Sequence, residues 1–368
     1  MFENALVIGK FYPPHAGHRH LIETAAAGAR SVWVLVQGSR FESLTVQQRA
    51  DWLAEEFAAV GNVTVIAVRN DCPEDFFSDE IWTAQLENMR LALKMRGVES
   101  IDVLFSSESY GERLAQAFTA VHIPVDPRRS AYPVSGTMCR ENLAAAWPLL
   151  VPAARRGMAV RIIVVGAEST GTTTLSEALS AHYRRRFPQL HDVVEYGRQF
   201  TYEKLAARQA SAPQTGVEDL VWTAADFGLI AERQTQLEQA AAEASPLVIA
   251  DTDALATTLW ERYYLGEGSY GSFAAVGQLP RRDIYLLTDH NGVDFEDDGW
   301  REGEHRRAEM TEWFKESLVE AGHSWILLTG SHERRMATAT AVIDSMLAQQ
   351  AAFTSPGWAG RTSMATTE

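Results

Sequence analysis

Two histidines lie at the point where a short apolar run gives way to a helical pattern. The run Ala5–Ile8 breaks at Gly9, and His15 and His18 follow just before the helical stretch. The first turn of a helix carries backbone N–H groups without partners, so two imidazoles there can bind one anion together with those amides. Gly17 lies between them and has no side chain to obstruct a nucleotide. The sequence therefore predicts a phosphate-binding site at this helix start.

A second stretch with the same chemistry runs from Val134 to Arg140. Ser135 and Thr137 can cap the helix expected at Arg140–Trp147, and the donors that cap a helix can also bind phosphate. Arg140 adds a guanidinium one turn into this helix, which can clamp a triphosphate through two parallel hydrogen bonds. Capping alone does not require that arginine, so Arg140 favours the phosphate-binding interpretation.

Both stretches resemble signatures of the nucleotidyltransferase superfamily. The run Gly9–His18 resembles G-K-F-Y-P-x-H-x-G-H of nicotinamide mononucleotide (NMN) adenylyltransferases, above all the NadR-type bifunctional enzymes, and Val134–Arg140 resembles their I-S-G-T-x-x-R. Ser106–Gly111 resembles their S-S-E-x-Y-G stretch. The resemblance implies adenylyl transfer from ATP to NMN. The residues expected to act in catalysis are Lys10, His15, His18 and Arg140, and those expected to bind ATP are Gly9, Phe11, Gly17, Ser135, Gly136 and Thr137.

Three further residues of the first half are candidate substrate contacts. Arg49 falls where related enzymes place a phosphate-contacting arginine at a helix start, but a helix capped by Thr45 with an exposed arginine explains it equally well. Trp82 falls where related adenylyltransferases stack an aromatic ring on nicotinamide, although a tryptophan on an amphipathic helix is more often part of the core. Glu108 belongs to the S-S-E-x-Y-G stretch.

A glycine-rich loop opens the second half of the chain. It begins at Gly166 between the predicted strand Val160–Val165 and the predicted helix Leu175–Arg186, which is the layout of a P-loop. The motif G-x-x-x-x-G-K-[ST] requires lysine where this chain has Thr172. The loop amides and the hydroxyl of Thr173, which we expect to bind magnesium, are retained, but the positive point charge that would contact the phosphates is lost. The predicted phosphate-binding residues are Gly166, Glu168, Ser169, Thr170, Gly171, Thr172, Thr173 and Thr174.

Three segments after this loop resemble ribosylnicotinamide kinases. Glu195–Arg198 resembles their E-Y-x-R run, Asp251–Asp253 follows the apolar strand Leu247–Ala250, and Asp297–Arg301 resembles the lid that closes an arginine over ATP. A surface ion pair, a helix cap and a solvated charge are the ordinary explanations of these segments. Their order after a P-loop favours a kinase that phosphorylates nicotinamide riboside.

The roles of individual residues in this second site stay open. The candidate acids are Asp251, Asp253 and Glu195, and the candidate magnesium ligands are Thr173 and Asp251. Arg198 or Arg301 can substitute for the missing lysine, with Lys204 as a further source of charge. Tyr202 or Trp222 can hold the nicotinamide ring, although helix packing explains both residues equally well.

The alternation of β-branched runs with helical patterns predicts an α/β fold with parallel sheets in both halves. In such sheets the ligand lies beyond the carboxyl ends of the strands, where the strand order reverses. We therefore expect a Rossmann-like nucleotidyltransferase domain followed by a P-loop kinase domain. The first-half strands are predicted at Ala5–Ile8, Val32–Val36, Val63–Val68 and Ile101–Phe105, and the helices at His18–Ala29, Val46–Val60 and Asp79–Arg96; a strand at Ile284–Leu287 is predicted in the second half.

The 368 residues are too many for one average domain, and we place the boundary near Pro152. The predicted parts are residues 1–152, a short linker at 153–158, residues 159–350, and a disordered tail at 351–368. The resemblance covers Ala5 to about Gln350, and because the first strand starts so near Met1 we expect no helix-turn-helix domain. Cys72 and Cys139 are expected to be reduced thiols.

The charge pattern limits the kinds of molecule that the protein can bind. The net charge is −15, without a block of basic residues that could follow a nucleic-acid backbone, and only four of the 33 basic residues are lysines. No secretory signal or membrane-spanning stretch is present, so we expect a cytoplasmic protein that binds neither nucleic acid nor membrane. The sequence does not indicate an oligomeric state.

Three classes of function follow from these observations. The first is a two-activity enzyme of NAD salvage whose small-molecule partners are ATP with magnesium, NMN, NAD and nicotinamide riboside. The second keeps only the adenylyltransferase, with the P-loop domain as a nucleotide-binding regulator or scaffold, because Thr172 stands where the lysine is required. The third is a non-catalytic sensor of NAD or ATP, which fits poorly with the pair of phosphate-binding signatures in the first half.

Overall fold

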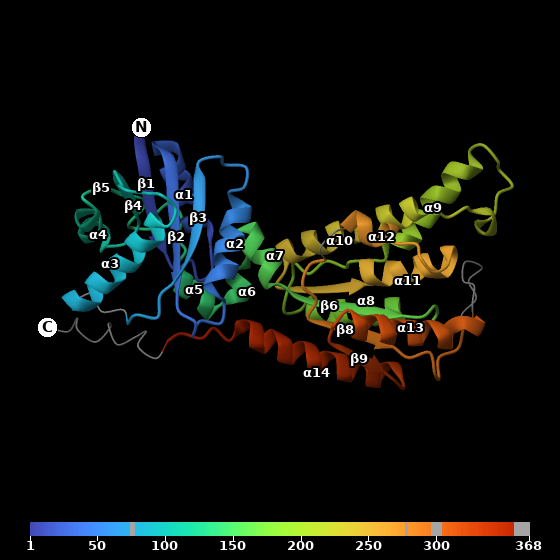
Figure 1. Cartoon of the computed structure of the whole chain (residues 1–368). Helices are drawn as coiled ribbons and strands as arrows, with labels where there is room; N and C mark the ends of the chain where they lie inside the picture. The colour runs from blue at the N-terminus through green and yellow to red at the C-terminus, as the bar shows by residue number, and fades with distance from the viewer. Residues whose placement is uncertain (74–77, 277–278, 296–303, 357–368) are drawn as a thin grey trace. The chain divides into compact units, whose positions relative to one another are not determined.

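The chain folds into two compact units in the computed structural model, which describes residues 1–73, 78–276, 279–295 and 304–356 (Figure 1). The first unit comprises Met1–Gly157 together with Ala351–Glu368, and the second comprises Met158–Gln350. Each unit is built on its own parallel sheet, as the alternating sequence pattern predicts. Among the described residues, no helix has both the length and the apolar character needed to cross a bilayer.

The sheet of the first unit has the strand order β3-β2-β1-β4-β5, and every pairing is parallel. The order reverses between β1 and β4, so the segments that follow these two strands meet at the switch point. This is the crevice that the sequence predicts for the ligand, although β5 was not predicted. The strands are β1 (Phe2–Gly9), β2 (Ala29–Gly38), β3 (Val63–Arg69), β4 (Val103–Ser106) and β5 (Val121–Pro124).

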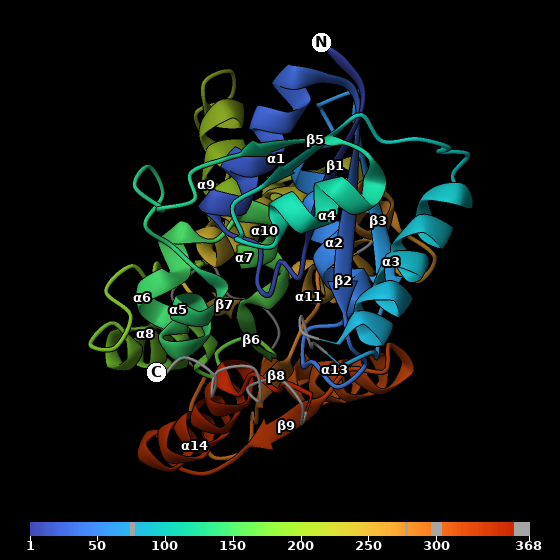
Figure 2. The same cartoon turned by 90° about the vertical axis from the view of Figure 1, so that its left-hand side faces the viewer.

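Helices cover both faces of this sheet because both faces of its strands are apolar. In β1, Ala5 and Val7 face one side and Leu6 faces the other, and all three are fully buried. The first side packs against α1 (Ala16–Gly28) and α2 (Val46–Glu56). The second packs against α3 (Asp79–Lys94) and α4 (Gly111–Phe118), and Figure 2 shows α1 and α3 on opposite sides of the strands.

The segment predicted as a linker at residues 153–158 is instead helix α7 (Pro152–Met158). Its Ala154 is fully buried, and Arg156 pairs with Glu55 of α2 at 2.6 Å. A Cβ on Gly157 would lie only 2.1 Å from the Trp52 ring, so the helix end fits closely against α2. The prolines and glycine that suggested a linker therefore shape a packed helix of the first unit.

The single helix predicted at Arg140–Trp147 is interrupted. Helix α5 (Gly136–Glu141) ends at Asn142, whose side chain then accepts a hydrogen bond from the Ala145 N–H at 3.1 Å and caps α6 (Leu143–Ala146). A 3₁₀ turn, η1 (Trp147–Leu149), follows directly.

The sheet of the second unit has the order β7-β6-β8-β9 and is also parallel. Its central strand β6 is buried along both faces, which explains its unbroken apolar sequence. Figure 1 shows α10 on one side of this sheet and α14 on the other. The strands are β6 (Val160–Gly166), β7 (Leu247–Asp251), β8 (Ile284–Thr288) and β9 (Trp325–Leu328), of which β9 was not predicted.

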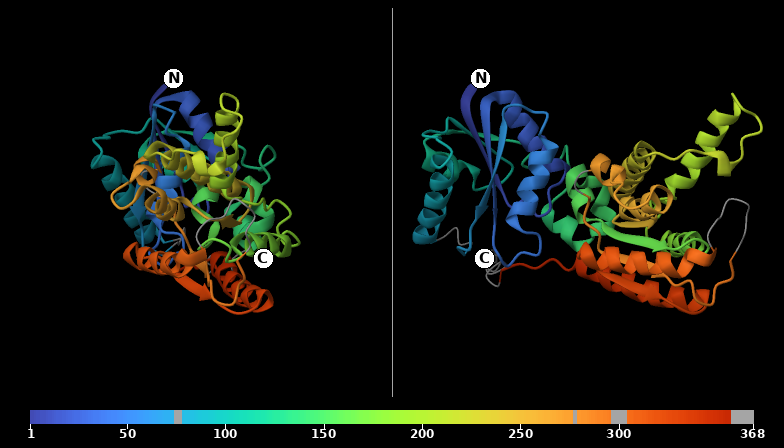
Figure 3. Two further views of the ribbon diagram at one scale, coloured as in Figure 1. Left: turned by 90° about the vertical axis from the view of Figure 1, so that its right-hand side faces the viewer. Right: turned by 45° about the vertical axis from the view of Figure 1, so that its right-hand side comes forward.

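The core of the second unit lies under α8 (Thr172–Tyr183) and α14 (His332–Ala351). On the other face, Gln234 of α10 (Ala224–Ala244) donates to the carbonyls at the end of β7. Helix α9 (Tyr196–Gln209) has no buried residue and projects away from the sheet, as Figure 3 shows. The other elements are η2 (Val217–Asp219), α11 (Ala254–Leu265), α12 (Gly271–Val276), η3 (Glu304–Arg306) and α13 (Arg307–Glu320).

The start of the tail predicted as disordered is packed against the first unit. The Phe353 ring meets the Tyr12 ring edge-on at 5.6 Å between centroids, and the Tyr12 hydroxyl donates to the Thr354 carbonyl at 2.7 Å. The Thr354 hydroxyl in turn donates to the Phe41 carbonyl at 2.7 Å. One aromatic ring and one threonine thus fix this segment, and residues 357–368 lie outside the described residues.

Candidate functional site

The first unit has a cavity of about 600 Å³ at the switch point of its sheet. The loop after β1, the loop after β4 and the start of α5 all contribute to its wall. The two signatures of the sequence therefore meet around one space. Of the predicted residues, those that line it are Gly9, Lys10, Phe11, His15, Gly17, His18, Trp82, Glu108, Ser135, Gly136, Thr137 and Arg140.

The two histidines form the cap of helix α1. His15 Nδ1 accepts a hydrogen bond from the His18 N–H at 3.4 Å, and His18 Nδ1 accepts one from the His15 N–H at 3.3 Å. Their rings stack with centroids 3.6 Å apart. Because both Nδ1 atoms are acceptors, the proton of each neutral ring lies on Nε2. The pair thus presents two Nε2–H donors from one helix start.

Burial keeps these imidazoles neutral. Desolvation, followed by the positive charge of Arg129, lowers the pKa of His15 to about 4. Desolvation, His15 and Arg129 lower the pKa of His18 well below its ordinary value. At neutral pH, both rings are therefore hydrogen-bond donors without charge. The Phe11 ring contacts the His18 ring edge-on at 4.8 Å and fixes its plane from behind.

Arg140 is held at the mouth of the same cavity. One guanidinium nitrogen donates to the Tyr12 carbonyl at 2.6 Å and another to the Thr137 hydroxyl at 3.1 Å. Ser135 caps α5 by accepting from the Met138 N–H, so the start of α5 has the cap that the sequence predicts. A Cβ on Gly136 would come within 2.9 Å of the Tyr12 carbonyl oxygen, which explains the glycine. These contacts place the Arg140 guanidinium and the first turn of α5 at the wall of the same cavity.

Arg49 does not line the cavity, and its side chain is fully buried. It pairs with Glu42 at 2.6 Å and donates to the Lys10 and Gln37 carbonyls. Neither the phosphate contact nor the exposed arginine of the sequence analysis is correct, because a buried carboxylate in the preceding loop holds this guanidinium inside. Lys10 lies 3.6 Å from Glu42 and still reaches the cavity. Arg49 therefore supports the backbone of the loop that carries Lys10.

Trp82 belongs to the core and to the cavity wall at once. It is 8% exposed, packs in the core under α3, and has Arg113 at 4.4 Å from its ring centroid. Glu108 lines the cavity and pairs with Arg129 at 3.1 Å. Sequence reasoning missed Arg129, which also lines the cavity and bears on both histidines. Its place beside Arg128, shortly after β5, was the available signal.

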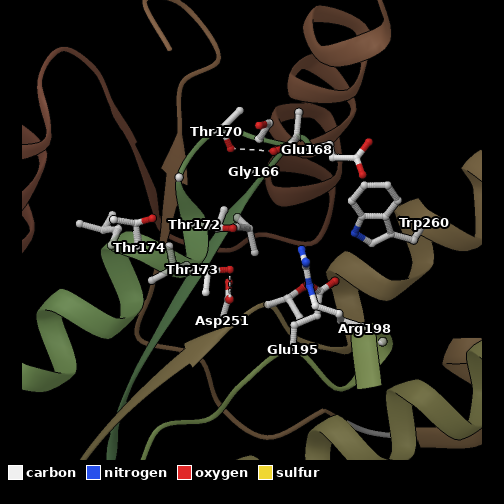
Figure 4. A pocket seen from close by; sticks show the side chains of 18 of the residues that line it. Gly166, Glu168, Thr170, Thr172, Thr173, Thr174, Glu195, Arg198, Asp251 and Trp260 are labelled. Atoms are coloured by element: carbon white, nitrogen blue, oxygen red, sulfur yellow. Dashed lines mark hydrogen bonds between the residues drawn. The ribbon is translucent and has the colours of Figure 1, made fainter. Parts of the chain in front are cut away.

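The second unit has a cavity of about 780 Å³ around its glycine-rich loop (Figure 4). The loop backbone is left-handed at Ser169 (φ 59°) and at Gly171 (φ 87°), and α8 begins directly after it. A Cβ on Gly166 would collide with the Thr288 and Thr170 hydroxyls, so the loop needs this glycine. All of the predicted loop residues line the cavity, namely Gly166, Glu168, Ser169, Thr170, Gly171, Thr172, Thr173 and Thr174.

Asp251 meets the loop because β7 lies beside β6 in the sheet. The Thr173 hydroxyl donates to Asp251 Oδ2 at 2.6 Å (Figure 4). Burial raises the pKa of Asp251, while hydrogen bonds from Thr173 and Thr172 and the charge of Arg198 oppose that shift. A buried carboxylate beside a hydroxyl offers oxygen ligands of the kind that magnesium prefers. These two residues therefore offer oxygen ligands suited to a divalent cation that accompanies a nucleotide.

Asp253 does not belong to this cavity. It is fully buried, caps α11 by accepting from the Ala256 N–H, and pairs with Arg282 at 3.0 Å. The Tyr285 hydroxyl also donates to it at 2.7 Å. Its place two residues after Asp251 suggested an acid in the site. Asp253 is instead the residue that caps the next helix, α11. Asp253 therefore stabilises the fold and is not available to a ligand.

Aromatic rings form one wall of the second cavity. Trp222 lies 5.4 Å from Tyr264 and 5.5 Å from Phe227, measured between ring centroids, and all three line the space. Tyr202 and Trp260 line it as well. The sequence indicated Tyr202 and Trp222 but missed the rings on α11, whose spacing has the ordinary pattern of a packed helix. Glu195 and Arg198 line the same cavity, whereas Arg301 lies outside the described residues.

Comparison with known proteins adds three findings. An AAA domain family model matches residues 161–335. The curated proteins named "Trifunctional NAD biosynthesis/regulator protein NadR" from Escherichia coli (strain K12) and Salmonella typhimurium are each 22% identical to the chain over 299 residues, which cover 78% of this chain and 68% of each relative. A solved NadR protein in complex with NR has a TM-score of 0.55 at 22% identity and covers 93% of this chain and 96% of its own.

A second solved structure, of NadR in complex with NAD and AMP-PNP, has a TM-score of 0.53 at 19% identity, and covers 94% of this chain and 96% of its own. The resemblance inferred from the motifs is confirmed, because the chain is homologous to the NadR proteins. The predicted fold class, two α/β units with parallel sheets, is confirmed as well.

Proposed function

We propose that the chain has two activities of NAD salvage. The first unit transfers the adenylyl group of ATP to NMN and releases pyrophosphate and NAD. The second unit phosphorylates nicotinamide riboside with ATP and supplies NMN. NadR, the named relative, is described as an NAD biosynthesis protein and has been solved with NR, NAD and an ATP analogue, which supports this choice of ligands.

One observation carries the adenylyltransferase assignment. Two neutral imidazoles with outward Nε2–H donors and the guanidinium of Arg140 line one cavity at the switch point of a parallel sheet. An oxygen of the NMN 5′-phosphate attacks the α-phosphorus of ATP, and the bond from that phosphorus to the β-bridging oxygen breaks. His15 and His18 donate hydrogen bonds to oxygens that gain charge, and Arg140 and Lys10 hold the departing pyrophosphate.

In the second unit the 5′-hydroxyl of the riboside attacks the γ-phosphorus of ATP, and ADP leaves with the bridging oxygen. The loop amides orient the phosphates, and Glu195 lines the cavity as a carboxylate able to accept the hydroxyl proton. Thr173 and Asp251 would hold the magnesium ion, which supplies charge neutralisation on the β- and γ-phosphates when bound. Trp222 and Tyr264, whose rings are tilted by 32° to each other, offer aromatic faces on which the nicotinamide ring can stack.

The test of the first activity uses the full chain with ATP, magnesium and NMN, and follows pyrophosphate release. We expect His18→Ala to lower kcat by about a hundredfold or more, since removal of one donor to a developing charge has effects of this size. The matched control is His20→Ala, on the same helix but outside the cavity lining. If His18→Ala keeps normal turnover with unchanged folding, the adenylyltransferase assignment is wrong.

A second candidate function rests on Thr172. Without the lysine of the motif, the second unit can bind a nucleotide as a regulator and leave adenylyl transfer as the sole activity. ADP release that depends on nicotinamide riboside separates the two cases. The absence of such release from a chain that still makes NAD selects the regulatory function.

A further inference from the structure

The cation that normally accompanies the phosphates in a P-loop has no lysine to supply it in this unit. None of the four lysines lines the second cavity in the part of the chain that the structure describes. Lys204 is tied to Asp226 at 2.6 Å, and Lys315 is paired with Glu312 at 2.7 Å. A transferring phosphoryl group carries charge that must be neutralised, so another side chain has to do this.

A hydroxyl takes the position of the missing lysine. Thr172 lines the cavity there, and the hydroxyl of its neighbour Thr173 donates to Asp251 Oδ2 at 2.6 Å. The loop start bears a negative group and two hydroxyls where the motif would place an ammonium. The positive charge must reach the phosphates from another part of the cavity wall.

Arg335 lines the cavity but is committed to the fold. Its Nη1 donates to the Thr170 carbonyl at 2.8 Å, its Nη2 to the Asp289 carbonyl at 2.9 Å, and its Nε to the Gly330 carbonyl at 3.1 Å. The residue is only 5% exposed. These bonds hold the loop from behind, and a move toward phosphate would leave buried carbonyls without partners. His332 also lines the cavity, but it carries neither the ammonium of a lysine nor the guanidinium of an arginine.

Arg198 lies on the open side of the cavity. It belongs to the first turn of α9 and is solvent-exposed, and Figure 4 shows its guanidinium directed toward the P-loop beside Glu195. Its charge acts on Asp251, which places it within electrostatic reach of the magnesium side of the site. Helix α9 has no buried residue, so a small movement of its first turn onto a nucleotide breaks little packing.

We propose that Arg198 takes the place of the P-loop lysine and binds the γ-phosphate during phosphoryl transfer. This inference rests on the proposed kinase activity of the second unit. As the riboside oxygen bonds to the γ-phosphorus, the bond to the β–γ bridging oxygen breaks, the electron pair stays with ADP, and the hydroxyl proton passes to a carboxylate. Arg198 donates to the equatorial oxygens throughout and remains charged.

The test compares variants of the full chain for riboside phosphorylation. We expect Arg198→Ala to lower kcat by about a hundredfold or more, within reach of the effects known for catalytic arginines, and Arg198→Lys to keep part of the rate. Arg208→Ala is the matched control, since this arginine is exposed on the same helix outside the cavity lining. Adding Thr172→Lys to Arg198→Ala should recover about tenfold, because it restores an ammonium at the motif position.

Two readouts keep the inference separate from the function on which it rests. Adenylyl transfer reports that the first unit is intact in each variant, and urea unfolding reports the stability of the second unit. Calorimetry with AMP-PNP and magnesium compares Arg198→Ala with Arg208→Ala, and because the first unit is the same in both variants, a difference in affinity belongs to the second unit. If Arg198→Ala phosphorylates riboside at the wild-type rate, the inference is overturned. If the wild-type chain shows no riboside phosphorylation, the proposed kinase activity is wrong. The affinity for AMP-PNP then tests the role of Arg198 by itself. An affinity about tenfold lower in Arg198→Ala than in the wild type supports phosphate binding by Arg198, and an unchanged affinity overturns it.

Discussion

The paired imidazoles of the first unit should make its stability fall between pH 7 and pH 5. The pKa of His15 is about 4 in the folded chain and 6.5 when unperturbed. Between these two values His15 is protonated in the unfolded state and neutral in the folded state. Stability is therefore fully present above pH 6.5 and is lost as the pH falls toward 4. His18, whose pKa is also lowered by burial, contributes with the same sign.

The size of the effect follows from the two pKa values of His15. Because His15 is protonated in the unfolded chain at pH 5, the free energy of unfolding is about 2 kcal/mol lower at pH 5 than at pH 7. The carboxylates of this unit whose pKa is lowered, Asp71 and Asp126, start from 3.8 and lose their contribution below that value. The range from pH 7 to pH 5 therefore isolates the imidazoles from these two groups.

The measurement is hydrogen exchange of the full chain at pH 7 and pH 5, read on peptides from β1 and α1 with correction for the intrinsic exchange rates. We expect His15→Asn to keep the helix cap, because asparagine caps well, and to remove about 2 kcal/mol of the pH dependence. Thr45→Asn is the control, since it changes the cap of α2, which has the same reciprocal form, without removing an imidazole. If His15→Asn shows the same pH dependence as the wild type, the neutral-imidazole account is refuted.

Three further predictions test other contacts. Gly136→Ala should displace the Arg140 guanidinium, 3.1 Å from the new Cβ, and lower kcat/KM of adenylyl transfer about tenfold in a pyrophosphate-release assay; an unchanged value would contradict the assigned role of this arginine. Arg282→Met should destabilise the second unit by about 3–5 kcal/mol in urea unfolding, because Asp253 is left charged and buried. Trp222→Ala should raise the KM for nicotinamide riboside about five- to tenfold and leave the KM for ATP unchanged, and an equal rise in both would exclude a platform for nicotinamide.

The elements that carry the two sites could be predicted because their signals are local. The apolar run before Gly9 and the hydroxyl-rich start of α5 each define a strand end or a helix start within a few residues. Once the sheet is parallel, the segments after β1 and β4 must meet at the switch point. Asp251 was indicated by the apolar strand before it and by the resemblance to P-loop enzymes, and the structure brings it to the loop because β6 and β7 are neighbours.

What could not be predicted depends on contacts between distant residues. Arg49 is buried because Glu42 and two backbone carbonyls accept its hydrogen bonds, and no local pattern signals that pairing. Asp253 is drawn inside by Arg282, which lies far along the chain. The segment around Thr354 looks disordered by composition, yet one ring and three hydrogen bonds fix it to the first unit. A few specific partners outweigh composition in each case.

The two cavities differ in how they hold a positive charge. Each has a helix start at its wall, where backbone amides can bind phosphate. The first adds neutral imidazoles and holds Arg140 by a carbonyl and a hydroxyl, so its cation is positioned before the ligand arrives. The second places hydroxyls at the loop and Arg198 on helix α9, which has no buried residue. We therefore expect the second site to order more on nucleotide binding than the first, because α9 is weakly packed whereas two hydrogen bonds hold Arg140.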